Sequence, residues 1–300
     1  MDIIILKVIP ILLIFLLGIL LKRLSILNDD SADSFLKFVF HVSFPASILI
    51  SIPRMVLTSE LLFLPLTAIA IIILSYFAAR AAGAFFNLSG PALGVFLVGS
   101  MIINTGFTYP FIIAVFGQEG FARAALFDFG NCLIILTFVY YVAVKYGRNG
   151  ETKIINKFLG STPLWALSIA VFLNLTGTSI PVMIDDFLQL LGNTLIPLFM
   201  ISLGLRFSLK VVNFKALFAV ISIRMFFGLL LGIGFVNIFG IEGLSRSVVL
   251  ISSAAPVGFN TLMFATLEDL DKEFAASIVS FSILIGIVLT TIMLFFLGSS

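Results

Sequence analysis

The chain consists mainly of apolar stretches that are long enough to cross a lipid bilayer. A helical crossing needs about 20 mainly apolar residues, and the sequence divides into ten such stretches, the sixth being the shortest. They cover residues 3–21, 35–52, 61–80, 92–116, 121–144, 163–177, 185–205, 214–239, 246–266 and 274–297. Lipid offers the backbone no hydrogen-bond partners, so each stretch must be helical. The sequence therefore predicts an all-α polytopic membrane protein with ten transmembrane helices.

The composition excludes an ordinary soluble domain. Of the 300 residues, 61% are hydrophobic and 11% are charged, and the mean hydropathy is +1.24. A soluble domain has about a quarter of its residues charged, so this chain is expected to reside in a bilayer. The net charge of +2 follows from basic loops and does not indicate a nucleic-acid partner. A single cysteine, Cys132, excludes an internal disulfide.

The loop charges predict the orientation of the chain. Cytoplasmic loops carry an excess of Lys and Arg. Three loop residues lie on one side of the membrane, Arg54, Arg123 and Arg246, and twelve lie on the other. The twelve are Lys22, Arg23, Lys37, Arg80, Lys145, Arg148, Lys153, Lys157, Arg206, Lys210, Lys215 and Lys272. We therefore expect a multi-pass protein of the plasma membrane with both termini outside and a cytoplasmic central loop.

Glycine and proline interrupt two of the spans at matching positions. Residues 104–110 read NTGFTYP and residues 256–261 read PVGFNT, and a shift of 152 residues places Gly106 on Gly258. Backbone groups freed by such breaks are tolerated at membrane depth only inside protein or beside a watery cavity. Paired interruptions in the two halves of a chain are typical of the substrate site of a transporter.

The same offset extends beyond the two interruptions. It places Pro45 on Pro197 and Arg54 on Arg206. Each half has five spans, an odd number, so the second half is expected to cross the membrane in the inverted direction. The sequence predicts a first five-helix repeat at 1–144, a cytoplasmic connector at 145–162 and an inverted second repeat at 163–300.

Motifs in both halves resemble those of the auxin efflux carrier (PIN-like) family. They are NTGFTYP at 104–110, FGQEG at 116–120, FDFGN at 127–131, Asn193 with Pro197, AAP at 254–256 and EFAA at 273–276. The resemblance covers nearly the whole chain. Leu229 stands where plant carriers have a proline, and the connector is short. Both departures favour a bacterial-type carrier.

The resemblance implies both a fold and an activity. The fold is that of the bile-acid/sodium symporters, with ten helices in two inverted repeats and broken helices 4 and 9 that cross. Helices 1, 2, 6 and 7 are then a scaffold with a homodimer interface, and helices 3–5 and 8–10 are a transport domain. The activity is export or exchange of small organic anions, such as auxin or dicarboxylates like malate, by alternating access.

The crossing of the two broken helices is the predicted substrate site. Half-helix N-termini present the positive end of the helix dipole there, which suits a carboxylate. Amides, hydroxyls and phenyl rings add donors and apolar walls. The candidate substrate-binding residues are Asn104, Thr105, Gly106, Phe107, Pro110, Pro256, Gly258, Phe259, Asn260 and Thr261. The alternative is that glycine and proline only kink two packed helices. No cofactor or metal is expected beyond a coupling proton or sodium ion.

Three ionisable residues are separate candidates for a proton or ion-pair role: Asp128, Arg224 and His41. An ionisable side chain inside a membrane is costly and is therefore a functional candidate. Asp128 is a candidate to carry a proton or balance a cation, the alternative being a structural ion pair. The donor fork of Arg224 suits a carboxylate substrate, but neutralisation of Asp128 is the favoured role. His41 is expected to make a helix contact rather than to relay protons.

Two other functions compete with that of an organic-anion carrier. An intramembrane enzyme is disfavoured because Asp128 is the one aspartate well inside a span, the chain has one histidine, and a hydrolase needs a positioned base. The acidic residues between 268 and 273 are interpreted as a solvated loop. A sodium-coupled symporter of the same fold is the nearer rival, since the breaks offer amide and hydroxyl oxygens. The crossing is expected to lack a carboxylate of its own.

Overall fold

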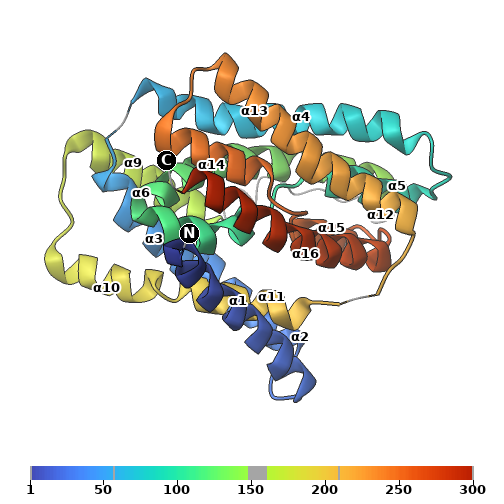
Figure 1. Cartoon of the computed structure of the whole chain (residues 1–300), viewed down its shortest axis with the longest axis horizontal. Helices are drawn as coiled ribbons and strands as arrows, with labels where there is room; N and C mark the ends of the chain where they lie inside the picture. The colour runs from blue at the N-terminus through green and yellow to red at the C-terminus, as the bar shows by residue number, and fades with distance from the viewer. Residues whose placement is uncertain (1, 57, 148–160, 209, 299–300) are drawn as a thin grey trace. The chain divides into compact units, whose positions relative to one another are not determined.

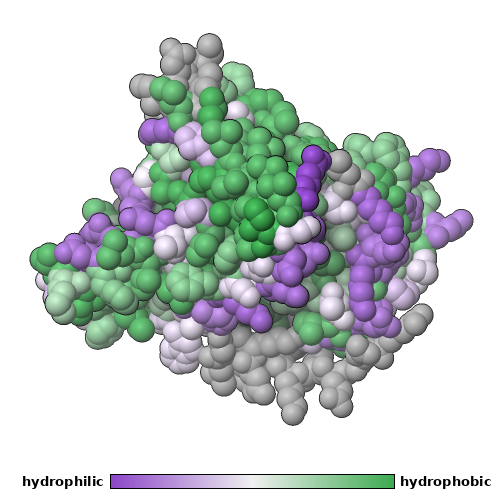
Figure 2. All heavy atoms as spheres, turned by 90° about the horizontal axis from the view of Figure 1, so that it is seen from below, coloured by the Kyte–Doolittle hydropathy of each residue, from purple (hydrophilic) through white to green (hydrophobic). Residues whose placement is uncertain are grey.

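The computed structural model describes residues 2–56, 58–147, 161–208 and 210–298, which form helices joined by short loops. Six helical stretches among them are long and apolar enough to cross a membrane: Asp29–Arg54, Ser59–Gly83, Thr105–Tyr146, Val182–Arg206, Phe214–Ile238 and Lys272–Leu297. Apolar residues cover wide areas of the face in Figure 2, as expected of a surface that contacts lipid. The prediction of an all-α polytopic protein is confirmed, whereas most of the predicted connector lies outside the described residues.

The chain divides into two compact units, and each is assembled from separate stretches of sequence. Figure 1 labels the helices and colours them by their place in the chain. Unit 1 contains Met1–Thr58, Tyr109–Ala125 and Leu159–Phe207. Unit 2 contains Ser59–Thr108, Leu126–Phe158 and Ser208–Ser300. Each unit therefore combines segments from both halves of the chain.

Close helix packing through glycine characterises unit 1. Its helices are α1 (Asp2–Arg23), α2 (Asp29–Phe38), α3 (Phe44–Ser51), α9 (Thr162–Thr176), α10 (Val182–Gly192) and α11 (Leu195–Arg206). A Cβ atom on Gly18 of α1 would lie 2.4 Å from the carbonyl oxygen of Ile201 on α11. A Cβ atom on Gly204 would lie 2.2 Å from the carbonyl oxygen of Phe15. Small residues of this kind let two transmembrane helices approach closely.

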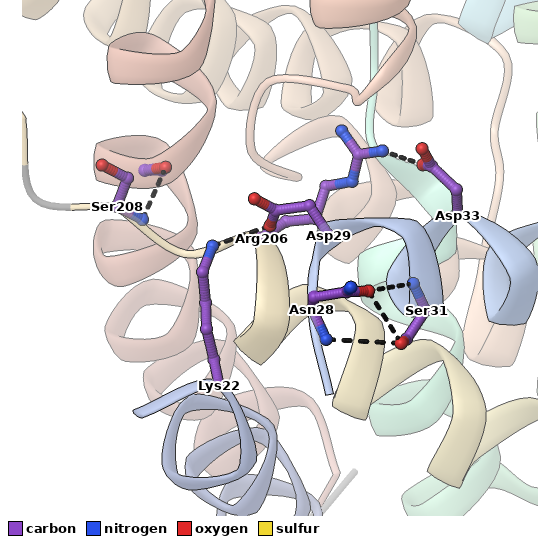
Figure 3. Close-up of polar contacts among 8 residues, drawn as sticks. Lys22, Asn28, Asp29, Ser31, Asp33, Arg206 and Ser208 are labelled. Carbon is purple, nitrogen blue, oxygen red and sulfur yellow. Dashed lines mark hydrogen bonds and ion pairs between the residues drawn. The ribbon is translucent and has the colours of Figure 1, made fainter. Parts of the chain in front are cut away.

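Polar contacts gather where α1 ends and α2 begins (Figure 3). The side chain of Asn28 accepts a hydrogen bond of 2.9 Å from a backbone N–H in the first turn of α2. Such a cap satisfies a donor that the helix itself leaves unpaired. Ion pairs join Lys22 to Asp29 and Arg206 to Asp33. The cap explains why the helix begins at Asp29, before the start of the predicted span.

Unit 2 holds the broken helices. Its elements are α4 (Phe63–Gly83), α5 (Gly90–Met101), the two ends of α6 (Thr105–Ile134), α7 (Tyr140–Tyr146), α12 (Phe214–Ile221), α13 (Gly228–Ile238), α14 (Gly243–Ser253), α15 (Asn260–Leu267) and α16 (Lys272–Leu297). The middle of α6, which belongs to unit 1, is kinked at Gly117, whose φ of +66° favours glycine. The predicted loop between the fourth and fifth spans is thus a single kink.

Both predicted interruptions are breaks between two helices of unit 2. The first break, residues 102–104, separates α5 from α6. The second break, residues 254–259, separates α14 from α15. Each break starts two residues before the corresponding sequence motif, because the preceding helix ends before its glycine is reached.

Candidate functional site

The two breaks meet inside unit 2 as a pair of extended segments, which we call the crossing. They form an isolated antiparallel β-bridge. Two backbone hydrogen bonds hold it, from the N–H of Asn104 to the carbonyl of Pro256 (3.0 Å) and from the N–H of Gly258 to the carbonyl of Ile102 (3.1 Å). Buried backbone groups need partners, and here the two breaks supply them to each other.

Gly258 permits this close approach. A Cβ atom at Gly258 would lie 2.3 Å from the Cγ2 atom of Ile102, closer than any ordinary contact. A second glycine, Gly286 of α16, receives the other side of the crossing. A Cβ atom there would lie 3.1 Å from the ring of Pro256 and 3.3 Å from the ring of Phe107. Packing therefore explains the glycine of the second motif.

The amide of Asn104 holds the first break in place. Its Oδ1 accepts from the N–H of Phe107 at 3.2 Å and so caps α6. Its Nδ2 donates to the carbonyl of Val257 at 3.2 Å. Both ends of this buried amide are thus engaged by the protein, which gives Asn104 a structural role in the crossing.

A carboxylate lies directly against the first break. Asp128 is buried, and its Oδ1 accepts from the hydroxyl of Thr105 and from the Nδ2 of Asn131 at 2.7 Å. The same amide donates to the carbonyl of Ile103 at 3.1 Å. The expectation that the crossing lacks a carboxylate was wrong, because Asp128 is distant from the break in sequence but is held against it by Thr105 and Asn131.

The structure gives Arg224 a different partner from the one expected. Its side chain is fully buried in the π-helical turn Ser222–Phe227. It donates to the carbonyls of Ser253, at 2.6 Å, and Ala255, at 3.3 Å. Within the described residues the guanidinium makes no ion pair with Asp128. The favoured expectation of such a pair is replaced by a contact with the end of α14.

Unpaired polar atoms concentrate at the second break. Four buried side-chain atoms there have no hydrogen-bond partner among the described residues: Ser252 Oγ, Ser253 Oγ, Thr261 Oγ1 and Arg224 Nη1. Asn260, the first residue of α15, is half-buried. Its amide also makes no hydrogen bond within the described part of the chain. This break therefore keeps donors that a ligand can use.

The remaining candidates are divided between the units. Gly106 is half-exposed and Phe259 half-buried in unit 2, whereas Phe107 is fully buried there. Pro110 is buried in the part of α6 that belongs to unit 1. His41 also belongs to unit 1, where its Nδ1 lies 2.8 Å from the hydroxyl of Thr162 on α9. That geometry is the expected helix contact.

Two residues that hold the crossing had no role assigned from sequence. Asn131 follows Asp128 by three residues, a spacing that places both on one helix face. Ser282 of α16 accepts from the N–H of Val257 at 3.1 Å. The spacing from Asp128 could have indicated a role for Asn131 in the sequence, whereas an isolated serine in an apolar helix, such as Ser282, gives no such indication.

Glu268 corrects the interpretation of the acidic loop. It is buried at the end of α15 and accepts from the hydroxyl of Tyr140 at 2.6 Å. It is therefore not a solvated residue. The described residues contain no group of three or more His, Cys, Asp or Glu side chains placed to hold a metal ion.

Known proteins match the chain along nearly its whole length. The family described as membrane transport protein matches twice, over residues 3–159 and 148–294. An uncharacterized transporter of Methanocaldococcus jannaschii is 29% identical over 90% of this chain and 91% of its own length. An uncharacterized transporter of Methanothermobacter thermautotrophicus is 28% identical over 94% of each chain. The double match agrees with an internal repeat.

Proposed function

We propose that this chain, which belongs to the membrane transport protein family, is a secondary carrier for small organic anions. This family is the auxin efflux carrier family that the sequence motifs resemble. The carrier exports or exchanges auxin-like compounds or carboxylates such as malate. It operates by alternating access at the crossing, either as a facilitative or as a secondary active transporter. Membership of a transporter family supports this over an enzymatic function.

The proposal includes a topology for the membrane. The chain crosses the plasma membrane ten times as two inverted repeats, with both termini outside and the connector in the cytoplasm. Unit 1 acts as a scaffold that forms a homodimer, and unit 2 moves substrate. The antiparallel direction of the two breaks supports the inversion, because inverted repeats present matching segments in opposite directions. The twofold family match supports the repeat.

The observation that carries the proposal is the set of unused donors beside the crossing. The half-helix α15 begins at Asn260, so its N-terminus and positive dipole end lie at the second break. The N–H groups of residues 261–263 already donate to the carbonyls of Gly258 and Phe259, so it is the dipole end that favours an anion there. The free amide of Asn260 and the buried, unpaired hydroxyl of Thr261 add side-chain donors. A carboxylate is the chemical group that matches this arrangement.

The test is efflux of labelled malate and auxin from proteoliposomes, with and without a pH gradient. Asn260→Ala should reduce carboxylate flux about 10-fold or more, since a hydrogen bond to a charged group contributes roughly 1.5–3 kcal/mol. Its thermal stability should match that of the unchanged protein. Asn87→Ala, at an exposed loop residue, is the matched control and should transport normally. Equal flux in all three proteins would remove the site assignment.

A sodium-coupled symporter is a second candidate, favoured by the carboxylate at the first break. Asp128 lies beside Asn131, whose Oδ1 is buried without a partner among the described residues. Carboxylate and amide oxygens are ligands that hard cations prefer. Uptake that rises with an imposed sodium gradient, and that loses this response in Asp128→Asn, supports the symporter. Flux that does not depend on the sodium gradient in either protein supports an uncoupled or proton-linked carrier.

A further inference from the structure

Arg224 is the largest fully buried side chain of the described residues, and it lacks a carboxylate partner. A buried charge is costly unless other groups compensate it. Among the described residues the compensation comes from backbone carbonyls. The carbonyl of Ser253 lies at the C-terminal end of the half-helix α14, where the dipole is negative, and that of Ala255 lies in the second break just beyond it.

These contacts use only part of the guanidinium. An arginine has five N–H donors in a fixed fork, and the two carbonyls engage Nε and Nη2. The Nη1 atom is buried without a partner among the described residues. A role limited to capping α14 leaves this donor unsatisfied, and an unmade buried hydrogen bond costs stability. An anion bound at Nη1 would supply the missing hydrogen bond.

Close packing surrounds the guanidinium, and Ser253, whose carbonyl it contacts, carries a second unpaired donor. A Cβ atom on Gly228 would lie 2.8 Å from Arg224 Nη2, so α13 approaches the guanidinium closely. A Cβ atom on Gly232 would lie 2.5 Å from the hydroxyl of Ser253, which is also buried and unpaired. Ala255 immediately precedes Pro256, whose carbonyl accepts from Asn104. The guanidinium therefore borders the crossing itself.

We propose that Arg224 binds the carboxylate of the transported anion through Nη1, with the hydroxyl of Ser253 as a second donor. This inference rests on the proposed function and assigns to Arg224 the recognition of substrate charge. Because the side chain is fully buried, binding requires a conformation in which the second break is exposed, and alternating access supplies one. Charge recognition then belongs to the second break rather than to both.

The test compares carboxylates with their uncharged amides in purified protein. Binding of malate and malamide, and of auxin and its amide, is measured by equilibrium binding of the labelled compounds. Arg224→Gln should weaken carboxylate binding about 10- to 100-fold while leaving amide binding unchanged. Arg246→Gln, at an exposed arginine on α14, is the control and should keep the preference for the carboxylate. If the role of Arg224 is purely structural, the substitution should change the binding affinities of the carboxylate and of the amide alike.

A second variant covers the case in which Arg224→Gln does not fold. Ser253→Ala removes a hydroxyl that no described residue engages, so the fold should persist while carboxylate binding falls about 2- to 10-fold. An unchanged carboxylate-to-amide ratio in the folded variants overturns the inference but leaves the carrier intact if flux continues. A wild-type protein that neither binds nor transports any of the carboxylates overturns the proposed function as well.

Discussion

The first and second breaks of unit 2 use their polar groups in opposite ways. At the first break, Asn104 bonds at both ends of its amide and Thr105 bonds to Asp128. At the second break, Thr261 and Ser253 have buried hydroxyls without partners among the described residues, and the amide of Asn260 is free. The side chains of Asn104 and Thr105 are thus paired, although the neighbouring Asn131 Oδ1 is not, whereas the second break leaves several donors unpaired.

The difference separates architecture from recognition. A satisfied buried network rigidifies a structure, whereas an unsatisfied buried donor is a cost that a ligand can offset. The first break therefore fixes the crossing, and the second is the side on which we expect the substrate. The following predictions test this division of roles.

The largest effect is expected where the breaks touch. Gly258→Ala places a methyl group against Ile102 and should lower the free energy of unfolding by about 3 kcal/mol, as overpacking does. Gly234→Ala in α13, where a Cβ atom would meet nothing within 4 Å, is the control. It should stabilise the helix by up to about 1 kcal/mol. Denaturant titration in detergent micelles measures both. Equal stabilities would mean that the contact between the breaks is not tight.

A smaller effect should distinguish the two asparagines. Asn104→Ala loses a helix cap and a hydrogen bond to Val257, so the free energy of unfolding should fall by about 2 kcal/mol. Asn260→Ala loses no protein partner and should stay within about 0.5 kcal/mol of the unchanged protein. The same titration compares them. A reversed order would contradict the assignment of structure to the first break and of binding to the second.

The smallest effects are expected for two threonine substitutions, which should change the stability of the protein in opposite directions. Thr108 donates to the carbonyl of Thr105 at 2.8 Å, so Thr108→Val should destabilise the protein by about 1 kcal/mol. Thr261 has a buried hydroxyl without a partner, so Thr261→Val should stabilise it by about 1 kcal/mol. Melting temperatures without ligand provide the measurement. The same sign in both variants would show that the breaks are equally satisfied.

Sequence reasoning located the helices because apolar length and bilayer thickness dictate them. It also placed both interruptions, because glycine and proline act locally on the backbone. The helix boundaries were less accurate. Asn28 extends its helix to an earlier start, and the kink at Gly117 replaces a loop, since a cap or a positive φ outweighs the apolar pattern.

The partners of the buried charges were not predictable in the same way. Asp128 reaches the first break through Thr105, and Arg224 reaches backbone carbonyls that any sequence would supply. Residue types reveal that a charge needs compensation, but not whether a side chain or a helix end provides it. The burial of Glu268 was missed for the same reason, because its partner Tyr140 is distant in sequence.

The bridge between the breaks has an evolutionary consequence. Its two hydrogen bonds join main-chain atoms only, so side chains of the second break without a protein partner, such as Asn260 and Thr261, can be replaced without disturbing it as long as Gly258 stays small. Mutation can therefore exchange the groups at the second break one at a time without dismantling the crossing. Under the proposed function, point mutations at the second break would change which anion is bound, while the backbone of the crossing is inherited unaltered.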